Sequence, residues 1–282
     1  MNIELIQVPY DSGYLCVRTG CGPDYFLDNG LAKLLQDKGH YTNVHRTESK
    51  TLFNAEIKTA FELNRLLAEH IRTLSDGCFP IVISGNCNSC VGALAGINEN
   101  DVGIIWFDAH GDFNTPDTTL SGFLDGMGLA MATGKCWRSL LYTIPGYKPV
   151  HERSVIHVGA LDLDDEEKRL LKQAGIPLIT KDLRDESAFI SSFRNALIHL
   201  TKQVKKIYIH IDMDVLETGQ AKANHLAISG GLSIEAIVNC IKLIKENFKI
   251  CGCGIASFDP AFDQDKFVMN AGFSLIETIL DN

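Results

Sequence analysis

Three side chains that can hold a metal ion follow the apolar run 104–107 at every second position. They are Asp108, His110 and Asp112. Successive side chains of a strand point to opposite faces, so Asp108 and His110 share one face where the strand ends. Asp112 follows Gly111, whose conformational freedom permits a turn back toward them. Carboxylates crowded in this way repel one another unless a cation lies among them. A strand end whose charges simply face water is the plainer interpretation.

A second apolar run, 206–211, ends in the same way at Asp212 and Asp214. The period of two again points both carboxylates to one face. Ligands of parallel α/β sheets gather outside the carboxyl ends of the strands, so we expect the two sets of side chains to meet. Four carboxylates and one imidazole suit one or two hard divalent ions. Manganese comes ahead of zinc or copper, and magnesium is an alternative.

Composition excludes several classes of function. The chain has 282 residues, with 45% hydrophobic and 22% charged residues and a net charge of −9. This charge disfavours nucleic acid and anionic membranes as partners and leaves a small molecule as the expected one. No apolar run approaches the roughly 20 residues of a membrane span. The first residues lack the basic start and apolar core of a signal peptide, which predicts a cytoplasmic location.

Nine cysteines, an odd number, are spread through apolar and helical contexts, as expected for reduced intracellular thiols. Cys87 and Cys90 form a C-x-x-C motif, and Cys251 and Cys253 form a C-x-C motif. These four sulfurs are candidates for a zinc site, and the first pair is a candidate redox dithiol. The strand-like setting of residues 251–253, without knuckle-like turns, argues against the zinc site.

Apolar periodicity predicts alternating strands and helices throughout the chain. The predicted strands are 3–9, 80–84, 104–107, 154–159, 176–179, 206–211 and 250–258. The predicted helices are 23–35, 57–74 with Asn54 as its N-cap, 91–97, 126–134, 165–173, 186–203, 233–248 and 265–280. This order predicts an α/β protein. Its layers are α/β/α around a mainly parallel central sheet, and one domain spans residues 1–282.

The order of these motifs resembles the arginase, agmatinase and formiminoglutamase family, the ureohydrolases. The resemblance covers nearly the whole chain, from Gly22-Pro23 to the last helix. Its anchors are Asp108-Ala109-His110-Gly111-Asp112, Asn114-Thr115-Pro116, Ser121-Gly122, Gly159 with Asp162 and Asp164, and Asp212-Met213-Asp214. The resemblance implies an arginase-like fold, a trimer or hexamer, and hydrolysis of a linear C–N bond by a hydroxide that a manganese pair activates.

The resemblance also implies roles for the metal-binding residues. Asp108 and Asp212 would bridge two Mn²⁺ ions, Asp112 would complete the first site, and His110 with Asp214 would complete the second. Two such cations lower the pKa of a shared water and stabilise the charge that develops during attack. The departing nitrogen then needs a proton from a nearby acid or base.

Three positions depart from the family pattern. The family's Gly-Gly-Asp-His-Ser loop aligns with residues 85–89, which places Asn88 at the histidine ligand of the first metal. Its neutral amide oxygen is a weaker manganese ligand, so one or two ions are expected. Asp125 replaces a histidine that handles protons or substrate, which a carboxylate can do only if its pKa is raised. Ser257 aligns with a glutamate that pairs with the guanidinium, and Asp125 or Asp164 is a candidate replacement.

Asn114 and Ser121 match positions that hold the amino-acid end of arginine in arginases, although ordinary loop capping also accounts for such residues. We therefore expect a manganese-dependent hydrolase of a guanidino, amidine or formimino bond, with Asp125 and His110 as catalytic groups. The changed positions Asn88, Asp125 and Ser257 support an alternative. In this alternative, a non-catalytic arginase-like protein binds a small molecule or partner and retains at most one metal.

Overall fold

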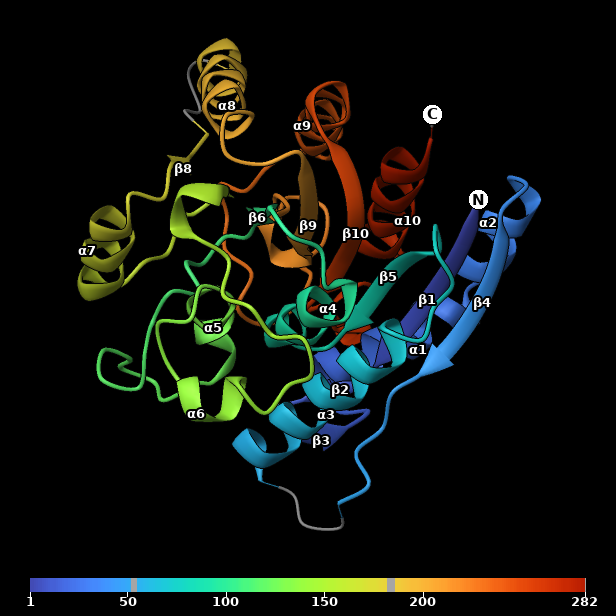
Figure 1. Cartoon of the computed structure of the whole chain (residues 1–282). Helices are drawn as coiled ribbons and strands as arrows, with labels where there is room; N and C mark the ends of the chain where they lie inside the picture. The colour runs from blue at the N-terminus through green and yellow to red at the C-terminus, as the bar shows by residue number, and fades with distance from the viewer. Residues whose placement is uncertain (52–54, 182–185, 282) are drawn as a thin grey trace.

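The computed structural model describes residues 1–51, 55–181 and 186–281. Eight parallel strands form its central sheet in the order β4-β1-β5-β10-β9-β6-β7-β8 (Figure 1). The strands of this sheet are β1 Asn2–Val8, β4 Tyr41–Arg46, β5 Phe79–Ser84, β6 Val102–Phe107, β7 Val155–Val158, β8 Leu178–Ile179, β9 Lys206–Asp212 and β10 Lys249–Ala256. A separate short hairpin pairs β2 Tyr10–Asp11 with β3 Tyr14–Leu15.

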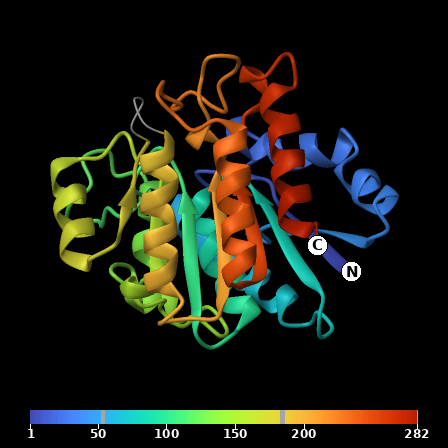
Figure 2. The ribbon, with the colours of Figure 1, turned by 90° about the horizontal axis from the view of Figure 1, so that it is seen from above.

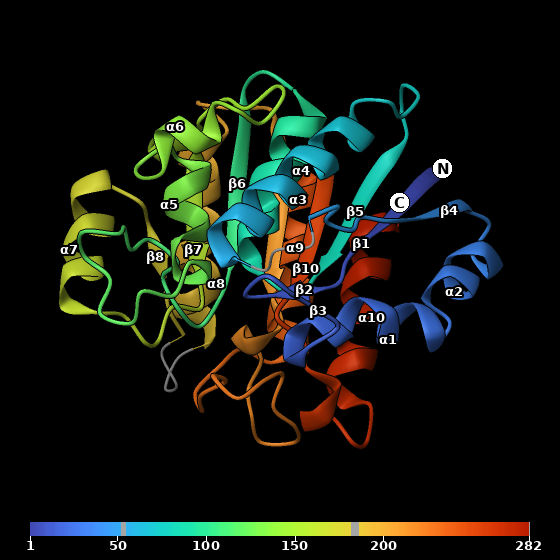
Figure 3. The ribbon, with the colours of Figure 1, turned by 90° about the horizontal axis from the view of Figure 1, so that it is seen from below.

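Helices cover both faces of the sheet, as the predicted three-layer α/β/α fold requires. The helices α8, α9 and α10 lie side by side on one face (Figure 2), and α3, α4 and α5 lie on the other (Figure 3). The α-helices are α1 Gly22–Asp28, α2 Leu31–Asp37, α3 Glu56–Ile71, α4 Cys90–Ile97, α5 Gly128–Ala132, α6 Arg138–Leu141, α7 Asp165–Ala174, α8 Glu186–Leu200, α9 Ile234–Asn247 and α10 Phe267–Leu280.

The central strands contribute to two hydrophobic cores at once. Ile105 and Phe107 of β6 belong to one buried cluster, while Ile104 and Trp106 belong to the other. Alternate side chains of a strand point to opposite faces, so a strand covered by helices on both sides is apolar at every position. The continuous apolar run that identified this strand in the sequence therefore reflects its place in the middle of the sheet.

Several element boundaries differ from the sequence-based prediction. The predicted helix 23–35 is two helices, α1 and α2, because Gly30 adopts a left-handed φ of 94° and ends the first of them. Strand β4 was not predicted, because it is an edge strand whose mixed exposure gives no clear alternation. The predicted helix 126–134 shortens to α5 after a 3-10 turn, Asp125–Met127. The expected cap Asn54 lies outside the described residues.

The sheet order determines which loops meet at its carboxyl edge. Strand β9 pairs with β6 on one side and with β10 on the other, and β10 pairs with β5. Phe107 pairs with Ile211, so the residues that follow them, Asp108 and Asp212, come from neighbouring strand ends. The loops after β5, β6, β9 and β10 therefore converge there. Within the described chain, no helix is long and apolar enough to cross a membrane.

Candidate metal centre

Asp108 lies directly after β6 and is almost completely buried, with 1% exposure. One carboxylate oxygen accepts a hydrogen bond from the backbone N–H of His110 at 2.7 Å, and the other accepts one from the indole N–H of Trp106 at 2.9 Å. Burial raises the pKa of Asp108 to about 6, against the opposing effect of His110. These contacts fix the carboxylate in one orientation at the strand end.

The His110 imidazole lies between two carboxylates, in the bend that follows β6. Its Nδ1 atom is 3.2 Å from Oδ2 of Asp214 and 3.5 Å from Oδ1 of Asp108. Burial opposes a charge on this ring, but both carboxylates outweigh burial and raise the pKa of His110. Asp108, His110 and Asp214 form one of two groups, among the described residues, whose ligand atoms all lie within 4.8 Å of one another.

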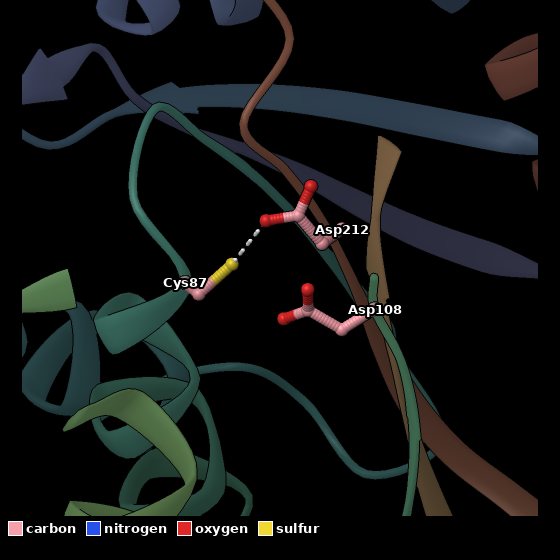
Figure 4. Close-up of side chains that lie close together, drawn as sticks. All are labelled: Cys87, Asp108 and Asp212. Carbon is pink, nitrogen blue, oxygen red and sulfur yellow. Dashed lines mark hydrogen bonds between the residues drawn. The ribbon is translucent and has the colours of Figure 1, made fainter. Parts of the chain in front are cut away.

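The second group of closely spaced ligand atoms contains Cys87, Asp108 and Asp212 (Figure 4). The Cys87 thiol donates a hydrogen bond to Oδ2 of Asp212 at 2.9 Å. The other oxygen of Asp212 caps the following turn by accepting from the backbone N–H of Asp214 at 2.8 Å. All three side chains of the group are buried, and Asp108 belongs to both groups. The two candidate metal positions are therefore adjacent and share a carboxylate.

Asn88 forms its side-chain hydrogen bonds with Asp125 and Asn64 rather than with Asp108 or Asp212, and its role as a metal ligand stays a prediction. Its Nδ2 donates to Asp125 at 3.0 Å, and its Oδ1 accepts from Asn64 of α3 at 3.4 Å. The 3-10 helix Cys87–Ser89 turns the side chains of adjacent residues in different directions. Cys87, one residue earlier, is the side chain that reaches the carboxylates.

Asp125 anchors the loop that carries Cys87. Its carboxylate accepts hydrogen bonds from the backbone N–H groups of Cys87 at 3.0 Å and Asn88 at 2.8 Å, and from the side chain of Asn86 at 2.9 Å. Burial raises the pKa of Asp125, although these hydrogen bonds oppose the shift. The raised pKa meets the condition for acid–base work at this position. The donors around the carboxylate also give Asp125 a clear structural role.

Asp112 completes the cluster and is buried in a left-handed backbone conformation with φ 49°. Burial and the neighbouring charges of Asp108, Asp125 and Asp212 raise its pKa well above the usual range of a carboxyl group. Burial and the nearby carboxylates Asp214 and Asp108 do the same for Asp212. A divalent cation offsets such crowding, because it neutralises charges that burial and mutual repulsion otherwise disfavour.

Four side chains of the cluster, His110, Asp112, Asp212 and Asp214, line a cavity of about 510 Å³. The four expected substrate-binding residues, Asn114, Ser121, Asp164 and Ser257, all line it. Asn114 donates a hydrogen bond to the half-buried Asp164 at 3.2 Å. Ser121 is exposed and caps its own turn by accepting from the N–H of Phe123 at 3.2 Å, which matches the loop-capping alternative. Ser257 lies 3.3 Å from the thiol of Cys87.

Two further features of the cavity were missed from the sequence. Asn224, in the loop after β9, donates to the carbonyl of Ser257 at 2.7 Å and approaches Asp214 at 3.5 Å, so it ties two site loops together. Arg18 also lines the cavity and forms an ion pair with Asp11 at 2.7 Å. Arg18 begins a short 3-10 helix and Asn224 lies in a loop, and no spacing signal in the sequence relates either residue to the strand ends.

The cysteines do not form the four-sulfur site that was considered. Each of the nine is free. The Cys251 thiol, in β10, donates a hydrogen bond to the carbonyl of Ile207 in β9. The Cys90 thiol faces the carbonyl of Gly128 at 3.9 Å rather than the carboxylates. Among the described residues, the groups able to hold a metal include a single cysteine, Cys87.

The parallel sheet with helices on both faces is a doubly wound α/β fold. The carboxylate, imidazole and thiol side chains gathered at its carboxyl edge form a candidate metal centre. A sequence profile of the arginase family matches residues 1–280. The chain belongs to the arginase family.

Known relatives cover this chain almost completely. Arginase from Brevibacillus brevis is 25% identical over 290 residues, which cover 99% of this chain and 97% of that protein. The crystal structure of arginase from Bacillus subtilis superposes with a TM-score of 0.87 at 25% identity, covering 100% of this chain and 99% of that one. Formimidoylglutamase from Bacillus subtilis has the same fold, with a TM-score of 0.76 at 17% identity over 99% of this chain and 86% of that one.

Proposed function

We propose that this protein is a metal-dependent hydrolase that cleaves a linear C–N bond of a guanidino, amidine or formimino compound. The observation that carries the proposal is the convergence of five buried or half-buried side chains at neighbouring strand ends of an arginase-family fold. These side chains, which we propose as the metal ligands, are those of Asp108, His110, Asp112, Asp212 and Asp214. Hydrolysis of such bonds is the activity that the family resemblance implies.

The donor set fits a pair of divalent ions, for which we propose Mn²⁺ in at least the position next to His110. Carboxylate oxygens with one imidazole are typical manganese ligands. The Nδ1 atom of His110 faces both Asp108 and Asp214, so these three side chains can enclose one ion. Asp108 and Asp212, together with Asp112, can hold the other ion, at the first metal position. A bound pair of ions would activate water as a Lewis acid. It would also stabilise the negative charge that develops when the water attacks the carbon of the C–N bond.

The charges of the cavity support a substrate with a cationic or strongly polar nitrogen group. Asp164 and Asp162 line its wall, and Arg18 is already paired with Asp11. Ser257 brings no charge to the position where the family has a glutamate. Asp164 is half-buried and oriented by Asn114, so we propose that it pairs with the substrate in place of that glutamate. This change favours a substrate other than arginine.

Proton transfer to the departing nitrogen requires a group that holds a proton near neutral pH. We propose Asp125 for this step, because burial raises its pKa and it lines the cavity beside Asp112. His110 would contribute by orienting the carboxylates on either side of it. The hydrogen bonds that Asp125 accepts from the loop favour a second candidate function, in which the residue is only structural and the protein binds its ligand without turnover.

A substrate screen distinguishes these two functions. The manganese-loaded protein is incubated with guanidino, amidine and formimino compounds, and released urea, ammonia and formamide are measured. Turnover that disappears in the Asp212→Ala variant supports the hydrolase. Saturable binding of these compounds without product, in protein that carries its full metal content, supports the non-catalytic alternative.

We also propose that residues 1–282 form a single domain, and that the protein is a cytoplasmic homo-oligomer, either a trimer or a hexamer. Both buried clusters pack on the same sheet, which supports one domain. Light scattering coupled to size-exclusion chromatography tests the oligomeric state, because a monomer mass would contradict this part of the proposal.

A further inference from the structure

We propose that Cys87 is a thiolate ligand of the first metal position, and that it makes this position selective for a thiophilic ion, Zn²⁺, over Mn²⁺. This inference rests on the proposed metal centre and names the ion that one half of it prefers. The Cys87 side chain points from the loop after β5 toward Asp212 and Asp108, which belong to two other strand ends (Figure 4).

The spacing of the three ligand atoms suits one ion. Zinc binds sulfur at about 2.3 Å and carboxylate oxygen at about 2.0–2.2 Å, so tetrahedral neighbours lie roughly 3.6 Å apart. The ligand atoms of Cys87, Asp108 and Asp212 lie within 4.8 Å of one another. The Cys87 sulfur is at a hydrogen-bonding distance of 2.9 Å from Oδ2 of Asp212, so the two atoms would move apart by about 0.7 Å to admit the ion. The ion would replace the thiol proton, which is released to solvent on binding because the thiolate is the ligand.

The surroundings of Cys87 exclude the other common roles of a cysteine. The side chain is 1% exposed, so oxidants and thiols in solution do not reach the sulfur, which disfavours a nucleophilic or redox role. The Cys90 thiol faces the carbonyl of Gly128, so the C-x-x-C spacing does not produce a dithiol directed at the site.

The loop holds the sulfur in place before any ion binds. Asp125 accepts the backbone N–H of Cys87, and the neighbouring Gly85 packs so tightly that an added Cβ would lie 2.3 Å from the carbonyl oxygen of Tyr10. Prepositioned ligands lower the cost of binding. Thiolate is a soft ligand that favours zinc, whereas manganese prefers oxygen and imidazole. The position next to His110 has no sulfur and keeps the hard-ion preference.

Cobalt substitution tests the thiolate directly. Co²⁺ replaces Zn²⁺ and gives an intense near-ultraviolet charge-transfer band when a thiolate is bound. We expect this band in the Co²⁺-loaded wild type and in Cys90→Ser, which alters a buried thiol that faces away from the carboxylates. We expect its loss in Cys87→Ser and Cys87→His, with folding checked by circular dichroism. Zinc–manganese competition should show at least a tenfold fall in zinc preference in Cys87→His.

Cobalt substitution and the zinc–manganese competition distinguish the thiolate ligand, the zinc selectivity and the metal dependence of the protein. Bound Co²⁺ without the band in the wild type, or a band that persists in Cys87→Ser, overturns the thiolate ligand while leaving the proposed hydrolase intact. Failure of the wild type to bind Co²⁺, Zn²⁺ or Mn²⁺ overturns the metal-dependent function as well. An unchanged zinc preference in Cys87→His contradicts the selectivity.

Discussion

The thiol of Cys87 lies 2.9 Å from the carboxylate of Asp212, although 125 residues separate them along the chain. The contact exists because β10 lies between β5 and β9, which brings the loop after β5 near the end of β9. Asp108 joins them from β6, the neighbour of β9 on the other side. The metal centre is therefore a product of strand order, and the following predictions test what it does.

Asp108, which both groups of ligand atoms share, and Asp212, which belongs to one of them, should be indispensable. We expect Asp108→Ala and Asp212→Ala each to lose bound metal and to reduce turnover by more than about 100-fold. Asp108→Ala removes a carboxylate ligand from both metal positions, and Asp212→Ala removes one from the position next to Cys87. Asp165→Ala is the matched control, since Asp165 is a fully exposed aspartate of α7. Metal content and initial rates check this, and unchanged metal content in both variants would refute the assignment.

Removal of metal should destabilise the wild-type protein. At a free metal concentration 100 times Kd, each site adds about 2.7 kcal/mol to the free energy of unfolding. A chelator should therefore lower Tm by roughly 5–10 °C. Differential scanning calorimetry with and without the chelator measures the shift. The Asp212→Ala variant should show little response, and an equal response in both proteins would contradict a specific metal effect.

Asp125 should contribute to stability as well as to the reaction. Asp125→Ala leaves the buried backbone N–H groups of Cys87 and Asn88 without their acceptor, which should lower the free energy of unfolding by roughly 2–4 kcal/mol. Urea denaturation measures this change. Asp117→Ala, in an exposed turn, is the control and should stay within about 0.5 kcal/mol of the wild type. If Asp125→Ala had the same free energy of unfolding as the wild type, the loop would not depend on these hydrogen bonds.

Close packing behind the Cys87 loop should make Gly85 intolerant of a side chain. In Gly85→Ala, the new Cβ would meet the carbonyl oxygen of Tyr10 at 2.3 Å and Gly20 at 2.7 Å. We expect a loss of stability of roughly 1–3 kcal/mol and weaker metal binding, because the backbone must shift. Gly219→Ala is the control, since nothing lies within 4 Å of its added Cβ. Equal metal affinities in the two variants would show that this contact does not position the loop.

The carboxylate pairs at the strand ends could be predicted from the sequence because they follow regular strands. Strand β6 ends at Phe107, and the bend that follows it, rather than strand alternation, brings His110 beside Asp108. Asp212 ends β9, and Asp214 lies in the 3-10 turn that follows it. The fold class followed from alternating strands and helices, since strands covered on both faces give continuous apolar runs.

The loops of the site could not be predicted in the same way. Whether Cys87 or Asn88 reaches the carboxylates depends on the rotation of one 3-10 turn, which has no periodic signal in the sequence. The turn at Asp112 depends on a left-handed backbone angle that non-glycine residues rarely adopt. Asn224 reaches Ser257 and Asp214 only through the folded loop after β9. Such contacts depend on tertiary packing.

Metal stoichiometry is the most direct test of the two-ion hydrolase. The wild-type protein is loaded with Mn²⁺ and Zn²⁺ together, desalted, and measured by inductively coupled plasma mass spectrometry. We predict two ions per chain in total, with about one zinc retained at the Cys87 position. In Asp108→Ala, which removes the carboxylate common to both groups of ligands, we predict less than one ion per chain. A wild type that retains no metal under these conditions would contradict the account.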